Sequence, residues 1–201
     1  MINKKLLAVA AIASVLSTSS AFAKTEGNYV GLNVLKSNIN SKDSSGKTNY
    51  KDYGFGVDYK YAFNFNGAFI APGAFFDSIT NLSRKNQGAV ANHNKFYRYG
   101  IKTNVGYDIT NDLSAYLVAG AAANTTSYHT SIREKHQNQT MTKVGFLYGL
   151  GTSYNLSKDV TLSAEFNREK VTFANTQSSN FPKDKATDTV SVAQIGVAYH
   201  F

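Results

Sequence analysis

The sequence predicts an all-β fold, an eight-stranded antiparallel up-and-down barrel, and three observations predict it. Four segments alternate apolar and polar residues with the period of two that marks a β-strand. Each segment contains a tyrosine near its end, and these tyrosines follow one another at spacings of 46, 47 and 45 residues. Short and long polar links alternate along the chain, as expected when hairpins are joined in series.

The first 23 residues are expected to be a cleaved signal peptide that lies outside the fold. Lys4 belongs to a basic start, an apolar run of 11 residues follows, and small residues close the segment with Ala21 and Ala23. This is the order of regions in a secretory signal. The apolar run is well short of the roughly 20 residues that a membrane-spanning helix needs. Cleavage after Ala23 would leave residues 24–201 as one barrel domain.

The clearest strand runs from Tyr53 to Phe63. Tyr, Phe and Val occupy one set of alternate positions, whereas Gly, Asp, Lys and Ala occupy most of the other. Short polar links of hairpin-turn length follow three of the four alternating segments, and each link leads into another strand. The other expected strands are Val30–Val34, Ala68–Phe76, Tyr97–Ile109, Leu113–Ala123, Val144–Tyr154, Val160–Asn167 and Ala193–Phe201.

The sequence leaves the facing of two strands open. Both alternate sets of Ala68–Phe76 and of Leu113–Ala123 are apolar or small, so periodicity does not say which set faces outward. Pro72 also lacks the N–H group that a regular ladder uses.

The apolar face of the strands is expected to contact lipid. A β-sandwich or a lipocalin-like barrel would place the large side chains inside. The interior of an eight-stranded barrel is only wide enough for side chains to fill, so this many Tyr and Phe rings would overfill it. A tilted strand from Tyr53 to Phe63 rises about 23–27 Å, close to the roughly 25 Å apolar band of a membrane barrel. Lipid offers no partner to an open edge, so the first and last strands must pair.

Four polar segments are expected to be long external loops, opposite short periplasmic turns. Structureless loops longer than about 12–15 residues are uncommon in soluble domains, whereas long external loops are normal in outer-membrane barrels. Lys and Arg outnumber Asp and Glu in these segments by 13 to 7. The expected loops are residues 36–52, 77–95, 124–142 and 168–188.

A polar cluster is expected inside the barrel, because its members all lie on the face opposite the aromatic rings. Buried charges must be paired, so Glu165 is predicted to meet Arg98 or Lys102 and to plug the lumen. The alternative is a narrow pore for ions or small solutes lined by the same charges. The predicted cluster contains Asp58, Lys60, Arg98, Lys102, Asp108 and Glu165.

The organisation of residues 24–201 resembles the small eight-stranded outer-membrane barrels of the OmpA transmembrane-domain, OmpX and opacity-protein type. The most specific element is the C-terminus, which is similar to the terminal aromatic signature that the barrel assembly machinery recognises. The resemblance implies a monomer in the Gram-negative outer membrane, with both termini periplasmic and with contacts to outer-membrane lipid and lipopolysaccharide. The residues that carry this signature are Ile195, Val197, Tyr199 and Phe201.

The basic loops indicate a structural or surface-interaction role, such as adhesion to a host surface or matrix, because a positive surface attracts anionic partners. Nucleic acid is not an expected partner, since the chain is exported and its basic residues are scattered. Neither a cofactor nor a metal is expected, because the chain has no Cys and no glycine loop that cradles phosphate.

Catalysis is not expected, although one short motif was compared with a known hydrolase. His129 and Ser131 loosely resemble the outer-membrane lipid A deacylases, whose Ser is activated by a His and a carboxylate. The Asn and Gly that follow the Ser in that family are replaced here by Ile132 and Arg133. No carboxylate is clearly placed to orient the His, and His129 with His136 lacks a third metal ligand. A lipid A-modifying hydrolase therefore stays a remote alternative.

Overall fold

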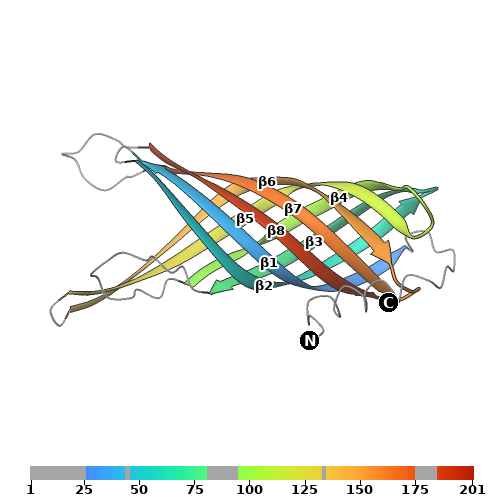
Figure 1. The fold of residues 1–201 in the computed structure, drawn as a ribbon, viewed down its shortest axis with the longest axis horizontal. Helices are drawn as coiled ribbons and strands as arrows, with labels where there is room; N and C mark the ends of the chain where they lie inside the picture. Colours follow the sequence, from blue (N-terminus) through green and yellow to red (C-terminus); the bar gives the residue numbers. More distant parts are fainter. Residues whose placement is uncertain (1–25, 44–45, 81–94, 133–134, 175–184) are drawn as a thin grey trace, which may run out of the picture.

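The computed structural model describes residues 26–43, 46–80, 95–132, 135–174 and 185–201. These residues form one closed barrel of eight strands in chain order (Figure 1). Among them there is no helix long and apolar enough to cross a membrane. The expected signal peptide, with Ala21 and Ala23, lies outside the described residues. The strands are β1 (Gly27–Asp43), β2 (Gly46–Phe65), β3 (Ala68–Thr80), β4 (Lys95–Asp108), β5 (Leu113–Ile132), β6 (Lys135–Asn155), β7 (Val160–Ala174) and β8 (Lys185–His200).

The barrel closes through antiparallel pairing of β1 with β8, as the sequence predicts. The ladder runs from Tyr29 opposite His200 to Lys42 opposite Thr187. Beyond it the Phe201 N–H donates to the Asn28 carbonyl at 3.1 Å. Every strand therefore has two hydrogen-bonded neighbours, and the barrel has no open edge to present to lipid.

Three short turns lie at the same end of the barrel as the paired terminal segments. The β2–β3 turn is the two-residue Asn66–Gly67, with φ of 56° and 94°. Positive φ at both central residues is the geometry of a type I′ hairpin turn, which Asn and Gly adopt at the lowest cost. Asn64 supports this turn by accepting a 3.2 Å hydrogen bond from the Gly67 N–H on its side-chain oxygen.

The opposite end of the barrel differs from the prediction, because several strands continue into the segments expected to be loops. Most of residues 36–52 belongs to β1 and β2, and most of 124–142 belongs to β5 and β6. The predicted strands end where their apolar side chains end. The ladder depends on backbone pairing instead, and Thr, Asn, Ser and Lys side chains leave that pairing intact in water.

The large apolar side chains face outward, as predicted. Phe146 is 83% exposed, Phe55 73% and Leu32 67%. The structure also shows which face of the two undecided strands, β3 and β5, points inward. Strand β3 buries Phe69, Ala71 and Phe75, and β5 buries Tyr116, Val118 and Ala122. The large apolar side chains thus form the outer face, and side chains from the alternate positions fill the interior.

The interior contains rings that the alternation did not predict. Tyr116 and Phe69 lie inside and meet edge-on, with ring centroids 6.4 Å apart. They fit because glycines face them. A Cβ atom on Gly151 would lie 2.5 Å from the Tyr116 ring, and one on Gly106 would lie 2.6 Å from Phe69. The interior therefore accepts a few rings where glycines face them, whereas the rings of the predicted apolar face lie outside.

Gly151→Ala is expected to lower the free energy of unfolding by about 1–3 kcal/mol, because the added methyl group overpacks the interior. The chain has no Trp, so unfolding by urea in phospholipid vesicles is followed by circular dichroism. The matched control is the same substitution in a Tyr116→Leu background, where the space is free and the added cost is expected to vanish. An equal cost in both backgrounds would contradict the proposed contact.

Candidate functional site: the polar interior

Buried polar side chains from several strands gather inside the barrel. They occupy inward positions of the period-two alternation, so each strand contributes at every second residue. Their exposed fractions are all below one tenth. The buried polar residues discussed below are Asn33, Asp58, Lys60, Asp77, Arg98, Lys102, Asn124, Glu165, Asn167, Glu169 and Gln194.

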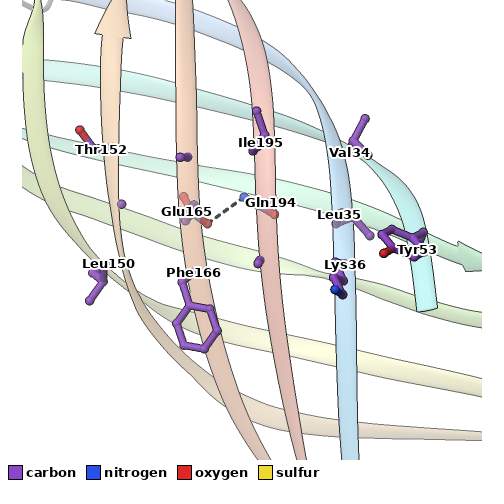
Figure 2. Close-up of a pocket in the computed structure, with 13 residues that line it drawn as sticks. Val34, Leu35, Lys36, Tyr53, Leu150, Thr152, Glu165, Phe166, Gln194 and Ile195 are labelled. Atoms are coloured by element: carbon purple, nitrogen blue, oxygen red, sulfur yellow. Dashed lines mark hydrogen bonds between the residues drawn. The ribbon is translucent and has the colours of Figure 1, made fainter. Parts of the chain in front are cut away.

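Glu165 on β7 is the centre of one group. Its Oε1 accepts hydrogen bonds from Lys102 Nζ at 2.7 Å, from Asn167 Nδ2 at 2.6 Å and from Gln194 Nε2 at 2.9 Å. Its Oε2 accepts from the Tyr116 hydroxyl at 3.3 Å. Figure 2 shows the bond between Glu165 and Gln194 on neighbouring strands. Four donors on one carboxylate balance the cost of removing its charge from water.

Arg98 on β4 is the centre of a second group and is only 1% exposed. Its Nη1 donates to Asp77 Oδ2 at 2.9 Å, and its Nε lies 3.5 Å from Glu169 Oε2. The Asn124 side-chain amide also donates to Glu169. The guanidinium carbon lies 5.4 Å from the centre of the Phe75 ring, which adds a cation–π contact.

Of the two predicted partners of Glu165, Arg98 and Lys102, the structure places Lys102 beside it. Arg98 is paired instead with Asp77 and Glu169. These two carboxylates are absent from the predicted cluster because both lie in segments predicted to be loops. The period-two alternation could have identified Glu169. It follows Glu165 by four residues, so a longer β-strand places it on the same inward face.

Asp58, Lys60 and Asp108 make other contacts. Asp58 accepts a 2.7 Å hydrogen bond from Asn33 Nδ2, and Lys60 Nζ lies 3.9 Å from its other oxygen. Asp108 is only partly buried and accepts from the Ser114 hydroxyl at 2.7 Å. The six residues of the predicted cluster are therefore held by four sets of contacts: Lys102 with Glu165, Arg98 with Asp77 and Glu169, Lys60 with Asp58, and Asp108 with Ser114.

Residues 8–201 match the model of the family described as "Outer membrane protein beta-barrel domain". The chain belongs to this family. A comparison with curated proteins found no match.

Solved structures with this barrel fold include other outer-membrane proteins. The attachment invasion locus protein Ail of Yersinia pestis is 20% identical, with a TM-score of 0.55 over 88% of this chain and 100% of that chain. Neisserial surface protein A is 20% identical, with a TM-score of 0.57 over 87% and 97%. OprG from Pseudomonas aeruginosa is 14% identical, with a TM-score of 0.51 over 90% and 99%.

The C-terminal residues of this outer-membrane barrel all face outward. Ile195, Val197, Tyr199 and Phe201 are 63%, 49%, 56% and 63% exposed. The rings of Tyr199 and Phe201 are stacked with their centroids 6.4 Å apart. This apolar row lies on β8 and its end, beside the seam where the barrel closes. A factor that binds the last strand before closure would find these side chains on one face.

The residues compared with lipid A deacylases lie at the opposite end of the barrel. His129 and Ser131 belong to β5, and His136 belongs to β6. Their side chains fall outside what the structure describes. Within the described part of the chain, no three His, Cys, Asp or Glu side chains gather as a metal-ligand set. The two features that can support a function are therefore the ion-paired, buried interior and the strands that extend beyond the apolar band at the end opposite the short turns.

Proposed function

We propose that this outer-membrane barrel is a non-catalytic surface-interaction protein with a closed lumen, which binds anionic glycans at the end opposite its termini. The termini would then lie in the periplasm, after removal of a signal peptide at Ala23. The C-terminal residues Ile195, Val197, Tyr199 and Phe201 would serve the assembly machinery during insertion. The single observation that carries the proposal is the extension of the basic strand ends beyond the apolar band.

The paired interior supports a closed lumen rather than a pore. Arg98 and Glu169 are each at most 1% exposed, and Lys102 and Glu165 are each at most 7% exposed. An ion crossing the barrel would have to displace these pairs and the rings packed beside them. Breaking a buried ion pair costs about 3–5 kcal/mol, which favours a static plug over a conducting path.

The extended end supports contact with a partner. Strands β1 and β2 pair as far as Asp43 opposite Gly46, and β5 and β6 pair as far as Ile132 opposite Lys135. Backbone ladders of this kind hold polar residues beyond the apolar band on a rigid support. Residues 36–52, 77–95, 124–142 and 168–188 together have 13 basic and 7 acidic residues, and this positive excess attracts anions.

One neighbour gives the ligand class a chemical precedent. Ail of Yersinia pestis was solved in complex with the heparin analogue sucrose octasulfate. A polysulfated sugar matches a surface whose excess charge is positive, because each sulfate offers oxygen acceptors to Lys and Arg. We therefore propose a sulfated or otherwise polyanionic glycan as the partner of this chain.

Lys42→Gln combined with Lys47→Gln is expected to weaken heparin binding by about tenfold at low salt, because it removes two of the positive charges that attract the ligand. These residues are opposite each other in the β1–β2 ladder. Binding of the refolded protein to immobilised heparin is measured across a salt series. Lys158→Gln, in the exposed turn at the other end of the barrel, is the matched control. Equal binding by the double variant and by the wild type would overturn the proposal.

A further inference from the structure

The outer wall of the barrel has a hollow of about 630 Å³ that spans five neighbouring strands (Figure 2). This volume lies within the roughly 300–1,000 Å³ range of small-ligand sites. The hollow crosses the seam between β8 and β1, and most of its lining comes from outward positions. The outward lining residues are Val34, Lys36, Tyr53, Leu150, Thr152, Ala164, Phe166, Ala193 and Ile195.

The register explains why the wall is hollow here. Ala193 on β8 lies between Lys36 on β1 and Phe166 on β7 in one cross-strand row. In the adjacent row, Ala164 on β7 lies between Ile195 and Thr152. Two alanines flanked by larger side chains leave a gap that no other residue fills. The result is an apolar groove with small residues at its floor.

One end of this groove is cationic. Lys36 is the first polar residue beyond the outward apolar run Val30, Leu32 and Val34 of β1. Its Nζ lies 5.6 Å from the centre of the Tyr53 ring, at the rim of the hollow. An apolar groove that ends at a Lys and a Tyr matches a molecule with a hydrocarbon tail and an anionic head.

The neighbouring strands carry the same sign of charge at this edge. On β7 the outward residue after Phe166 is Arg168, and on β2 the outward residue before Tyr53 is Lys51. The carboxylates of these two strands near this edge, Asp52 and Glu169, occupy inward alternate positions. The outer face above the groove therefore presents cations to the lipid headgroup region.

We propose that the groove holds an acyl chain of a phosphorylated lipid A, with a lipid phosphate against Lys36. The inference rests on the orientation in the proposed function, which places this end of the barrel in the outer leaflet. The small floor at Ala193 and Ala164 admits the chain, and the surrounding apolar side chains replace its lipid neighbours. Lys36 and Arg168 supply the positive charge that a phosphate requires.

The test is native mass spectrometry of the detergent-solubilised protein with added lipid A. Ala193→Phe fills the groove, and Lys36→Gln removes the rim charge. Each is expected to lower the bound fraction about fivefold, and lipid A without its phosphates is expected to bind as weakly. Ala119→Phe, at an exposed position on β5, controls for added bulk, and Lys158→Gln controls for lost charge. Both controls are expected to bind lipid A like the wild type.

Three outcomes would overturn the inference. Ala193→Phe could bind as much lipid A as the wild type, dephosphorylated lipid A could bind equally well, or phosphatidylglycerol could compete on equal terms. Folding of Ala193→Phe is checked by comparing the gel migration of unboiled and boiled samples. If boiling leaves its migration unchanged, the variant has not folded, and Ala193→Leu replaces it. Heparin binding does not involve the groove, so the glycan proposal can fail while the lipid A proposal holds, and the reverse is also true.

Discussion

Arg98→Met is expected to lower the free energy of unfolding by about 3–5 kcal/mol, because it leaves two buried carboxylates without their cation. Asp77 and Glu169 are 3% and 0% exposed, so water does not replace the lost guanidinium. Met retains much of the volume of the side chain, which separates the loss of charge from the loss of packing. Urea titration in phospholipid vesicles, followed by circular dichroism, gives the measurement.

A triple variant is the control for this prediction. Adding Asp77→Asn and Glu169→Gln to Arg98→Met removes the unpaired charges and is expected to recover most of the lost stability. A stability of Arg98→Met equal to that of the wild type would show that the Arg98 pairs do not hold the interior together.

The folded wild type is expected to give no steady conductance in planar bilayers, and a steady current would refute the closed lumen.

Ile101→Arg is expected to cost about 2–4 kcal/mol, the range for a cation near the midplane of the lipid-facing surface. Ile101 is 69% exposed and lies near the middle of the outward residues of β4. In water the same change at an exposed position would cost little. The large expected effect therefore depends on hydrocarbon being the solvent of this face.

The control for Ile101→Arg is Ile101→Val, which keeps the position apolar and is expected to change the stability by less than about 1.5 kcal/mol. Lys158→Arg shows the effect of an Arg in a water-exposed turn. Both variants and Ile101→Arg are compared by urea titration in the same vesicles. If Ile101→Arg proved as stable as Ile101→Val, the lipid-facing assignment of β4 would be wrong.

Much of the fold follows from the parity of side chains. The period of two places Phe55 and Phe146 on one face and Lys102 and Glu165 on the other, because successive residues of a strand point to opposite sides. Lipid outside and a narrow interior then decide which face looks outward. The strand count and the seam follow from the same reasoning, since lipid excludes an open edge.

The rest of the interior did not follow, for two physical reasons. Apolar content marks where a strand leaves the membrane, whereas hydrogen bonding marks where it ends, so Asp77 and Glu169 were assigned to loops. Strand β3 has apolar residues on both faces, so its sequence did not show that Phe69 and Phe75 point inward. The fit of Phe69 depends on Gly106 of β4, and only the register reveals that complementarity.

The seam between β1 and β8 joins residues at opposite ends of the chain, from Tyr29 opposite His200 to Lys42 opposite Thr187. Until the final strand has been made, the edge of β1 lacks a partner and its N–H and C=O groups can pair with another chain. Contacts this distant also form late, because the entropy of ordering the intervening chain must be lost first. The incomplete chain is therefore prone to aggregate until the residues of β8 are in place.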